Sequence, residues 1–330
     1  MLKKLGLALL TVAMLIALAG CGGSAQQNNQ QPQQSENKSD KIKVSVVLKA
    51  ANSDYWKIVT AGAEQAGKDL GVDVKVLGPN AETDVTGQIS MIEDQIVNKV
   101  SALVVAPSQP SSAIAAFDKA KAAGIPVVLA DTDANWDSKV SFVGTGNLAG
   151  GKQAGEYLAK KLGKGAKVAI LRGALGDPTH DERANGAKEM LEAGGVKIVT
   201  IQPANSERAM AVSVMENILQ ANPDIQGVFA TNDEMALGAL QALQAAKKNI
   251  PVVGFDGSPD ALKSIKEGKL DASIAQSPYN IGKMSVEAAV KAVKGEQVEK
   301  RIDTGTQVIN KDNVDQSISE LEKILGKKII

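Results

Sequence analysis

The sequence predicts an α/β protein of two similar lobes, each a doubly wound parallel sheet, joined by a hinge that the chain crosses several times. The chain has 330 residues, more than one compact core usually holds. From residue 41 onwards short β-rich runs alternate with helical stretches, the order that builds right-handed βαβ units. The segment IPVVLAD at 125–131 is repeated as IPVVGFD at 250–256, an offset of 125 residues.

Two further matches support the duplication. The tripeptide at 61–63 corresponds to that at 185–187, so that Gly62 and Gly186 lie 124 residues apart. The four residues at 90–93 correspond to those at 213–216, an offset of 123. Three nearly equal offsets in the same order indicate two lobes of similar winding rather than a chance likeness of hydrophobic strings.

The N-terminal segment has the pattern of an export signal. Lys3 and Lys4 precede an apolar run at 5–19, which is shorter than the ~20 residues that span a bilayer. The tetrapeptide LAGC at 18–21 resembles a bacterial lipobox. We therefore expect residues 1–20 to be a lipoprotein signal peptide and Cys21 to carry a lipid anchor, with an uncleaved membrane helix as the alternative.

A flexible tether follows the anchor. Residues 21–40 are rich in Gln, Asn and Ser, contain no large apolar side chain, and cannot bury enough surface to fold. The lipid and the tether together predict an extracytoplasmic protein held at the outer face of a membrane or in the periplasm.

The strands of the folded body are predicted from their apolar, β-branched composition. In the first series they lie at 44–48, 72–76, 102–105 and 127–130, and in the second at 167–171, 196–201, 227–230, 252–255 and 272–275. Between the first two strands a helix is expected over 55–70, with Ile58, Ala61, Ala66 and Leu70 on one face.

The predicted boundaries assign each lobe two segments of chain. The N-terminal lobe takes residues 41–144 plus 277–306, and the C-terminal lobe takes 145–276 plus 307–330. Helical periodicity over 314–330 predicts a last helix that packs on the second lobe or on the hinge.

Composition excludes several classes of function. Lys+Arg and Asp+Glu both number 37, so the formal net charge is zero and no basic face for nucleic acid is expected. One cysteine and one histidine exclude disulfide scaffolds, Cys-based zinc sites and His-rich metal clusters. A Ser-His-Asp relay would have to use His180. We expect no metal, no cofactor and no catalysis.

Ligand-binding residues are expected directly after strands, because open α/β sheets bind ligands at the carboxyl ends of their strands. Polar and aromatic side chains stand at these places in both series: Lys49, Ser53, Tyr55, Trp56, Asp131, Arg183, Asn232, Asp256 and Gln276. Asp131 and Asp256 are repeat partners, so they point to a shared ligand more than to two helix caps. Carboxylate, amide and guanidinium groups suit vicinal hydroxyls, and aromatic faces suit the C–H face of a sugar ring.

These residues resemble the motifs of the pentose/hexose periplasmic-binding family, which includes ribose-, galactose- and allose-binding proteins. The resemblance covers roughly residues 41–310 and follows the family's order: VLK at 47–49, YW at 55–56, Asp131, Arg183 with NGA at 185–187, TNDEMA at 231–236, GFDG at 254–257 and AQ at 275–276.

The resemblance implies the type I-like periplasmic binding protein fold, whose lobes close over one monosaccharide before the closed form engages the permease of an ABC importer. It also implies that the polar residues bind hydroxyls or the ring oxygen and that Tyr55 and Trp56 stack on the sugar. Lys49 and Trp56 favour the allose-like branch. Two departures are SDYW at 53–56, in place of Asn-Pro-aromatic-aromatic, and Ser206, where relatives often carry an aromatic residue. We expect a monomer.

Three other functions share part of these sequence features. A nucleotide-dependent enzyme is suggested by GTGNLA at 144–149, but the acid expected about 20 residues further on is missing, and the glycines suit a crossover near Thr145. A sugar-responsive repressor would need an N-terminal helix-turn-helix in place of the lipobox and tether. A receptor for another small polar ligand, such as a cyclitol, a nucleoside or a furanosyl signal, stays open.

Overall fold

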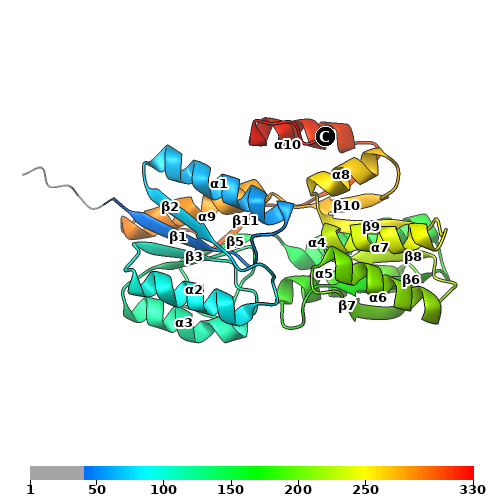
Figure 1. Ribbon diagram of the computed structural model, residues 1–330, viewed down its shortest axis with the longest axis horizontal. Helices are drawn as coiled ribbons and strands as arrows, with labels where there is room; N and C mark the ends of the chain where they lie inside the picture. Colours follow the sequence, from blue (N-terminus) through cyan, green and yellow to red (C-terminus); the bar gives the residue numbers. More distant parts are fainter. Residues whose placement is uncertain (1–40) are drawn as a thin grey trace, which may run out of the picture. The chain divides into compact units, whose positions relative to one another are not determined.

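The computed structural model of the protein describes residues 41–330, which form ten helices and twelve strands in two six-stranded sheets. Helices cover both faces of each sheet (Figure 1). This confirms the predicted fold class. The predicted signal peptide, Cys21 and the tether lie outside the described residues.

The first sheet, which with its helices we call the first lobe, has parallel strands in the order β11-β5-β4-β3-β1-β2. Its strands are β1 (Lys43–Val47), β2 (Asp73–Leu77), β3 (Ala102–Val105), β4 (Val127–Ala130), β5 (Phe142–Gly144) and β11 (Arg301–Asp303). One face packs on α1 (Asp54–Leu70) and α9 (Pro278–Val293), the other on α2 (Val85–Val97) and α3 (Pro110–Ala122). Burial on both faces explains why the central strands are continuous apolar runs.

The second sheet, the second lobe, has the order β12-β10-β9-β8-β6-β7, with only the β12–β10 pair antiparallel. Its strands are β6 (Lys167–Arg172), β7 (Lys197–Pro203), β8 (Gly227–Ala230), β9 (Val252–Asp256), β10 (Ala272–Ala275) and β12 (Gln307–Asn310). One face packs on α4 (Asn147–Leu162) and α5 (Pro178–Ala193). The other packs on α6 (Arg208–Ala221), α7 (Asp233–Ala245), α8 (Pro259–Lys266) and α10 (Val314–Leu325).

The internal repeat corresponds to equivalent places in the two lobes. Strands β4 and β9, which begin at the two valines of the IPVV segments, each occupy the third position of their sheet. Gly62 and Gly186 each lie where two helices cross closely. A Cβ on Gly62 would lie 2.0 Å from the carbonyl oxygen of Tyr279, and one on Gly186 would lie 2.3 Å from that of Leu148. Both glycines therefore allow backbone-to-backbone packing of helices.

We expect Gly62→Ala to destabilise the protein by about 1–3 kcal/mol, because the added methyl group forces α1 away from α9. Urea unfolding followed by circular dichroism measures this. Glu64→Ala, an exposed change on the same helix, should shift the unfolding free energy by less than about 0.5 kcal/mol. Equal midpoints for the two variants would contradict close packing at Gly62.

The chain passes between the sheets three times. The passages join β5 to α4, β10 to α9, and β11 to β12. They are bonded to one another: Thr145 Oγ1 donates to Gln276 Oε1 at 2.5 Å, and the amide of Thr304 donates to the carbonyl of Gly144 at 2.9 Å. The predicted multi-crossover hinge is thus present, and residues near Thr145 take part in it.

Some local predictions were wrong. The sequence pattern did not predict β5, β11 and β12 as strands, since they have three or four residues each and β11 and β12 are largely polar. On α1, Ile58 and Ala66 are buried as predicted, but Leu70 is exposed and Ala61 only partly buried, because the buried face also takes in Val59 and Ala63. The last helix, α10, packs on the second lobe through Val314 and Ile318.

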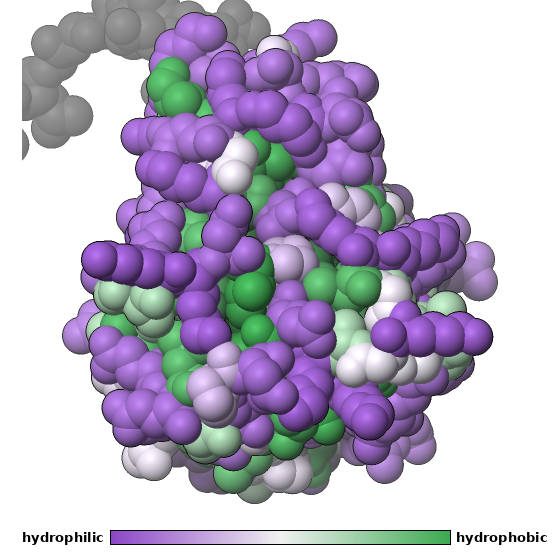
Figure 2. All heavy atoms as spheres, turned by 90° about the vertical axis from the view of Figure 1, so that its right-hand side faces the viewer, coloured by the Kyte–Doolittle hydropathy of each residue, from purple (hydrophilic) through white to green (hydrophobic). Residues whose placement is uncertain are grey.

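The surface of the second lobe is mainly hydrophilic. On the face turned to the viewer in Figure 2, polar and charged side chains predominate, and apolar side chains show between them in separate areas. Among residues 41–330, no helix has the length and apolarity needed to cross a membrane.

Candidate functional site

Eight of the nine ligand-binding residues predicted from the sequence line one cavity, to which both lobes contribute. They are Lys49, Tyr55, Trp56, Asp131, Arg183, Asn232, Asp256 and Gln276. Most stand just after a strand or in the first turns of the helix that follows it, so the carboxyl edges of the two sheets supply them. Ser53 is not among them, because its hydroxyl caps α1 by accepting from the amide of Trp56.

Lys49 is the buried cation of the first lobe. Its Nζ donates to Asp177 Oδ2 at 2.5 Å, across to the second lobe, and lies 3.5 Å from Asp131 Oδ1. Burial alone would lower the pKa of Lys49, but Asp177, Asp131 and Glu82 outweigh it and raise the pKa. Burial likewise opposes ionisation of Asp177, yet Lys49 brings the pKa of this carboxyl down to about 2. The pair is therefore fully charged at neutral pH.

Arg183 is the buried cation of the second lobe. Its Nε donates to Asn147 Oδ1 at 2.8 Å, and its guanidinium also donates to the carbonyl of Thr231 at 3.0 Å. The guanidinium carbon lies 4.0 Å from the centre of the Phe255 ring, and one terminal nitrogen is 3.5 Å from Asp256 Oδ1. Packing and hydrogen bonds thus hold the guanidinium in one orientation beside the cavity.

Asp256 is held by Gln276 as well as by Arg183. Gln276 Nε2 donates to Asp256 Oδ1 at 2.7 Å, while the Gln276 carbonyl accepts from Thr145. Burial raises the pKa of Asp256 well above its ordinary value, although Arg183 opposes the shift. A ligand hydroxyl can therefore meet either an acceptor or a donor at this carboxyl.

The two repeat-related aspartates share an unusual backbone. Asp131 has φ 61° and Asp256 has φ 119°, in a region that side-chain-bearing residues rarely adopt. Both stand at the carboxyl end of the third strand of their sheet and line the same cavity. Such backbone conformations are costly and concentrate at functional sites. The strained backbone at both positions supports the prediction that the two carboxylates bind the same ligand.

Three cavity residues were missed by sequence reasoning: Glu82, Thr179 and His180. Glu82 lies in the loop after β2, and its Oε1 accepts from Trp56 Nε1 at 2.9 Å. Burial alone would raise the pKa of Glu82, but the nearby His180 ring and Lys49 ammonium lower it. The usable signal is their place after strands: Glu82 follows β2, and Thr179 and His180 stand in the first turn of α5, the helix after β6.

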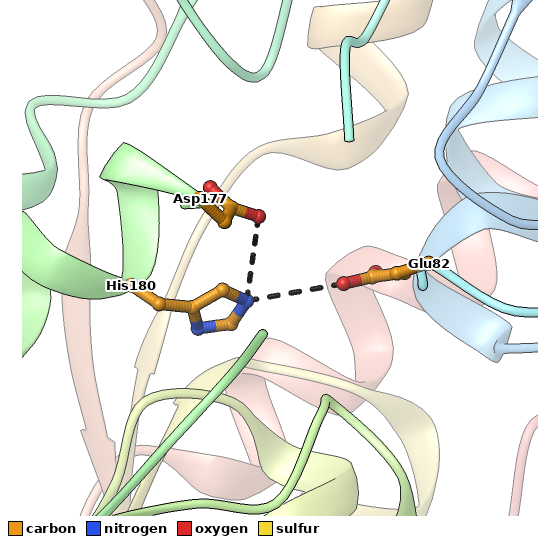
Figure 3. A group of neighbouring side chains, drawn as sticks. All are labelled: Glu82, Asp177 and His180. Atoms are coloured by element: carbon orange, nitrogen blue, oxygen red, sulfur yellow. Dashed lines mark ion pairs between the residues drawn. The ribbon is translucent and has the colours of Figure 1, made fainter. Parts of the chain in front are cut away.

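Glu82, Asp177 and His180 form a small cluster across the two lobes (Figure 3). His180 Nε2 lies 3.9 Å from Glu82 Oε2 and 3.8 Å from Asp177 Oδ2. Sequence reasoning considered only His-rich or Cys-based metal sites and did not weigh this mixed set. Asp177 is already paired with Lys49, and a fixed cation so close opposes binding of a second one. We therefore treat the cluster as part of the polar network around Lys49 and not as a metal site.

Asn232 and Asp233 differ in role although they are neighbours. Asn232 Oδ1 caps α7 by accepting from the amide of Met235, and the residue also lines the cavity. Asp233 lies behind it, fully buried, and accepts from the amide of Ser258 at 2.8 Å and the hydroxyl of Ser273 at 2.7 Å. Burial raises the pKa of Asp233 to about 7 in spite of these bonds.

We expect Asp233→Asn to stabilise the protein at pH 8 but not at pH 4. An acid whose pKa is raised on folding costs stability progressively as pH rises from its unfolded value, near 4, to its folded value, near 7. The amide oxygen can accept from the amide of Ser258, and the amide nitrogen can donate to the hydroxyl of Ser273, so both contacts persist without ionisation. Melting curves should show the variant at least about 2 °C above wild type at pH 8 and level with it at pH 4. A gap that does not change with pH would contradict a raised pKa.

Comparison with known proteins agrees with this architecture. A family model described as a periplasmic binding protein domain matches residues 44–297. The chain is 39% identical over 301 residues to the ribose import binding protein of Bacillus subtilis, covering 91% of this chain and 97% of that protein. It is 33% identical over 265 residues to the D-allose-binding periplasmic protein of Escherichia coli, covering 77% and 85%.

Solved structures agree as well. The periplasmic solute-binding protein of an ABC transporter from Actinobacillus succinogenes, with bound D-allose, superposes with a TM-score of 0.78 at 31% identity and covers 84% of this chain and all of that one. These matches are consistent with the architecture described above. It has two sheets of the same winding, three crossovers, and a cavity between the carboxyl edges of both sheets. The chain belongs to the periplasmic binding protein family.

Proposed function

We propose that the protein is an extracytoplasmic solute-binding lipoprotein that captures a monosaccharide, a pentose or hexose of the ribose or allose type, and delivers it to an ABC transporter. The observation that carries the proposal is the pairing of Asp131 and Asp256, one from each lobe, at a single cavity. The ribose- and allose-binding relatives support the class of ligand. The ABC transporter solute-binding protein from Actinobacillus succinogenes supports an ABC importer as the partner. On this proposal the protein acts as a monomer.

The chemistry of the cavity suits a neutral polyol. Lys49 and Arg183 offset the charge of the two aspartates, which makes their burial tolerable. Carboxylates accept and amides and guanidinium donate, so a ring with neighbouring hydroxyls can satisfy several groups at once. Tyr55 and Trp56, edge to face with ring centres 5.0 Å apart, supply apolar surface for the C–H face of such a ring.

Binding on this proposal requires the lobes to move. The free space among the cavity side chains is small, so a sugar ring can enter only when the lobes separate. The moving bodies are residues 41–144 with 277–306 and residues 145–276 with 307–330, and the three crossovers absorb the rotation. Ligand hydroxyls then take over contacts that side chains make with one another across the cavity.

The test is a melting-temperature screen of the purified protein with D-ribose, D-allose, myo-inositol and adenosine. A ligand at about 100 times its dissociation constant stabilises by ~2.7 kcal/mol, which is several degrees for a protein of this size. We expect a pentose or hexose to give this shift. Stabilisation by adenosine alone, or by none of the four, would contradict the proposal, and myo-inositol alone would assign a cyclitol receptor.

The lipid anchor has its own test. We expect Cys21→Ser to move the protein from the membrane fraction to the soluble extracytoplasmic fraction, because a thioether-linked lipid needs the sulfur of Cys21. Fractionation with an immunoblot checks this, and Ser24→Ala in the tether is the matched control. Membrane retention of the Cys21 variant would favour an uncleaved membrane helix.

A further inference from the structure

His180 is the only histidine of the chain, and the function proposed above gives it no role. It lies in the first turn of α5, is 3% exposed, and lines the cavity. A histidine in a helix is often a core residue with satisfied nitrogens. The imidazole ring of His180 therefore either packs as a core side chain or contacts the ligand.

The two ring nitrogens are both engaged by the protein. Nδ1 lies 2.8 Å from the hydroxyl of Thr231, and Nε2 lies 3.1 Å from the hydroxyl of Ser206. Hydroxyls can donate or accept, so both contacts hold for either tautomer. These two contacts restrict rotation of the ring. Because both nitrogens are engaged, a ligand would contact the face of the ring.

One face of the ring is covered by main chain. A Cβ on Gly173 would lie 2.2, 2.4 and 2.6 Å from the ring atoms Cδ2, Nε2 and Cγ. Three nearly equal distances place this point over the ring plane, since a point beside the edge would be much farther from two of the atoms. Only glycine allows this approach. The opposite face is therefore the one that the ring can turn to the cavity.

The first lobe brings its own aromatic surface to the same cavity. Tyr55 and Trp56 line it, and Trp56 donates to Glu82, whose other carboxylate oxygen lies 3.9 Å from His180 Nε2 (Figure 3). Glu82 thus connects the aromatic pair of the first lobe with the imidazole of the second. The aromatic pair of the first lobe and the imidazole ring of the second lobe therefore line one cavity, with the carboxylate of Glu82 between them.

We propose that His180 is a ligand-contacting, specificity-determining residue that forms the flat wall of the second lobe, and that Gly173 positions its ring. The inference rests on the proposed function and deepens it. The wall stands next to Ser206, where the sequence carries no aromatic side chain. It selects a cyclic polyol with an apolar ring face, held between His180 and the Tyr55–Trp56 pair, over an open-chain polyol.

The single histidine makes direct observation possible. Tag-free protein labelled only at histidine gives one set of imidazole signals in an NMR spectrum. We expect these signals to move when the protein is saturated with D-ribose, D-allose or myo-inositol, whichever binds in calorimetry. We also expect ribitol, which has hydroxyls but no ring, to bind at least about tenfold more weakly than D-ribose if D-ribose is the ligand.

Variants separate contact from a merely structural role. His180→Ala should weaken binding of the same probe by about tenfold or more, whereas His180→Phe, which keeps a flat wall, should stay within about threefold of wild type. Gly173→Ala should move the imidazole signals even without ligand and weaken binding about tenfold. Lys188→Ala, on the exposed side of the same helix, should bind as wild type does.

Failures of the two proposals look different. A wild type that binds none of the three probes contradicts the proposed function and this inference with it. A wild type that binds a probe while the His180 signals stay in place contradicts the inference alone. Equal affinities for Gly173→Ala and wild type would do the same, and this variant keeps the test open if His180→Ala does not fold.

Discussion

Lys49→Met is expected to lower the affinity of the protein for its sugar by at least about a hundredfold, and to shift the unliganded lobes towards an open arrangement. Lys49 is the cation between Asp177 and Asp131, and all three side chains are almost fully buried. Removing one partner of a buried ion pair costs about 3–5 kcal/mol, because the other charges stay behind without compensation. Each 1.4 kcal/mol lost from the closed state is about a tenfold loss of affinity.

Calorimetry measures the affinity, and small-angle scattering of the unliganded protein measures the separation of the lobes. Lys57→Met is the matched control, since Lys57 pairs with Asp54 at the exposed start of α1 and such pairs contribute little. Adding Asp177→Asn to Lys49→Met should recover part of the loss by removing a stranded charge. Wild-type affinity in Lys49→Met would show that the cross-lobe pair is dispensable.

The Lys49–Asp177 ion pair also sets the lowest pH at which it can stabilise the closed arrangement of the lobes. The pKa of Asp177 is depressed to about 2, so its contribution is complete above about pH 4 and is lost as pH falls towards 2. Between pH 5 and 8, this ion pair therefore adds no pH dependence to closure.

Asp131→Ala and Asp256→Ala should each weaken sugar binding at least about tenfold while the protein stays folded. A buried polar group that loses its hydrogen-bond partner costs about 1–3 kcal/mol, and each carboxyl group is placed to bond ligand hydroxyls from its own lobe. Calorimetry with the sugar found by the melting screen measures both affinities. Circular dichroism checks that the variants are folded.

Two aspartates that do not line the central cavity, Asp133 and Asp260, provide controls in the same lobes. Asp133→Ala changes a carboxylate that pairs with Lys139 outside the central cavity, and Asp260→Ala changes one that pairs with Arg208 on the surface. Both variants should bind as wild type does. Unchanged affinity in Asp131→Ala and Asp256→Ala alike would remove the central support for a sugar site here.

Much of this architecture can be inferred from local sequence patterns. Apolar runs such as VVLA at β4 are long enough and β-branched enough to specify buried strands, and the repeat offsets place β4 and β9 in equivalent positions. The rule that ligands bind after parallel strands then selects Asp131, Asp256 and Lys49 without coordinates. Side-chain periodicity and the succession of strands and helices depend on neighbours in the chain, which is why they can be predicted from the sequence.

Which residues meet across the two lobes is decided only by the folded chain. Lys49 and Asp177 are 128 residues apart, and nothing in either local pattern indicates that they pair. Glu82 comes from the loop after β2 and His180 from the first turn of α5, and how these segments meet depends on how the helices pack. Ser53 illustrates the opposite case, since a hydroxyl at the start of a helix can turn to a ligand or cap the helix, and here it caps. Strands and repeats follow from short-range chemistry, whereas these partnerships follow from the geometry of three crossovers that bring two sheet edges together.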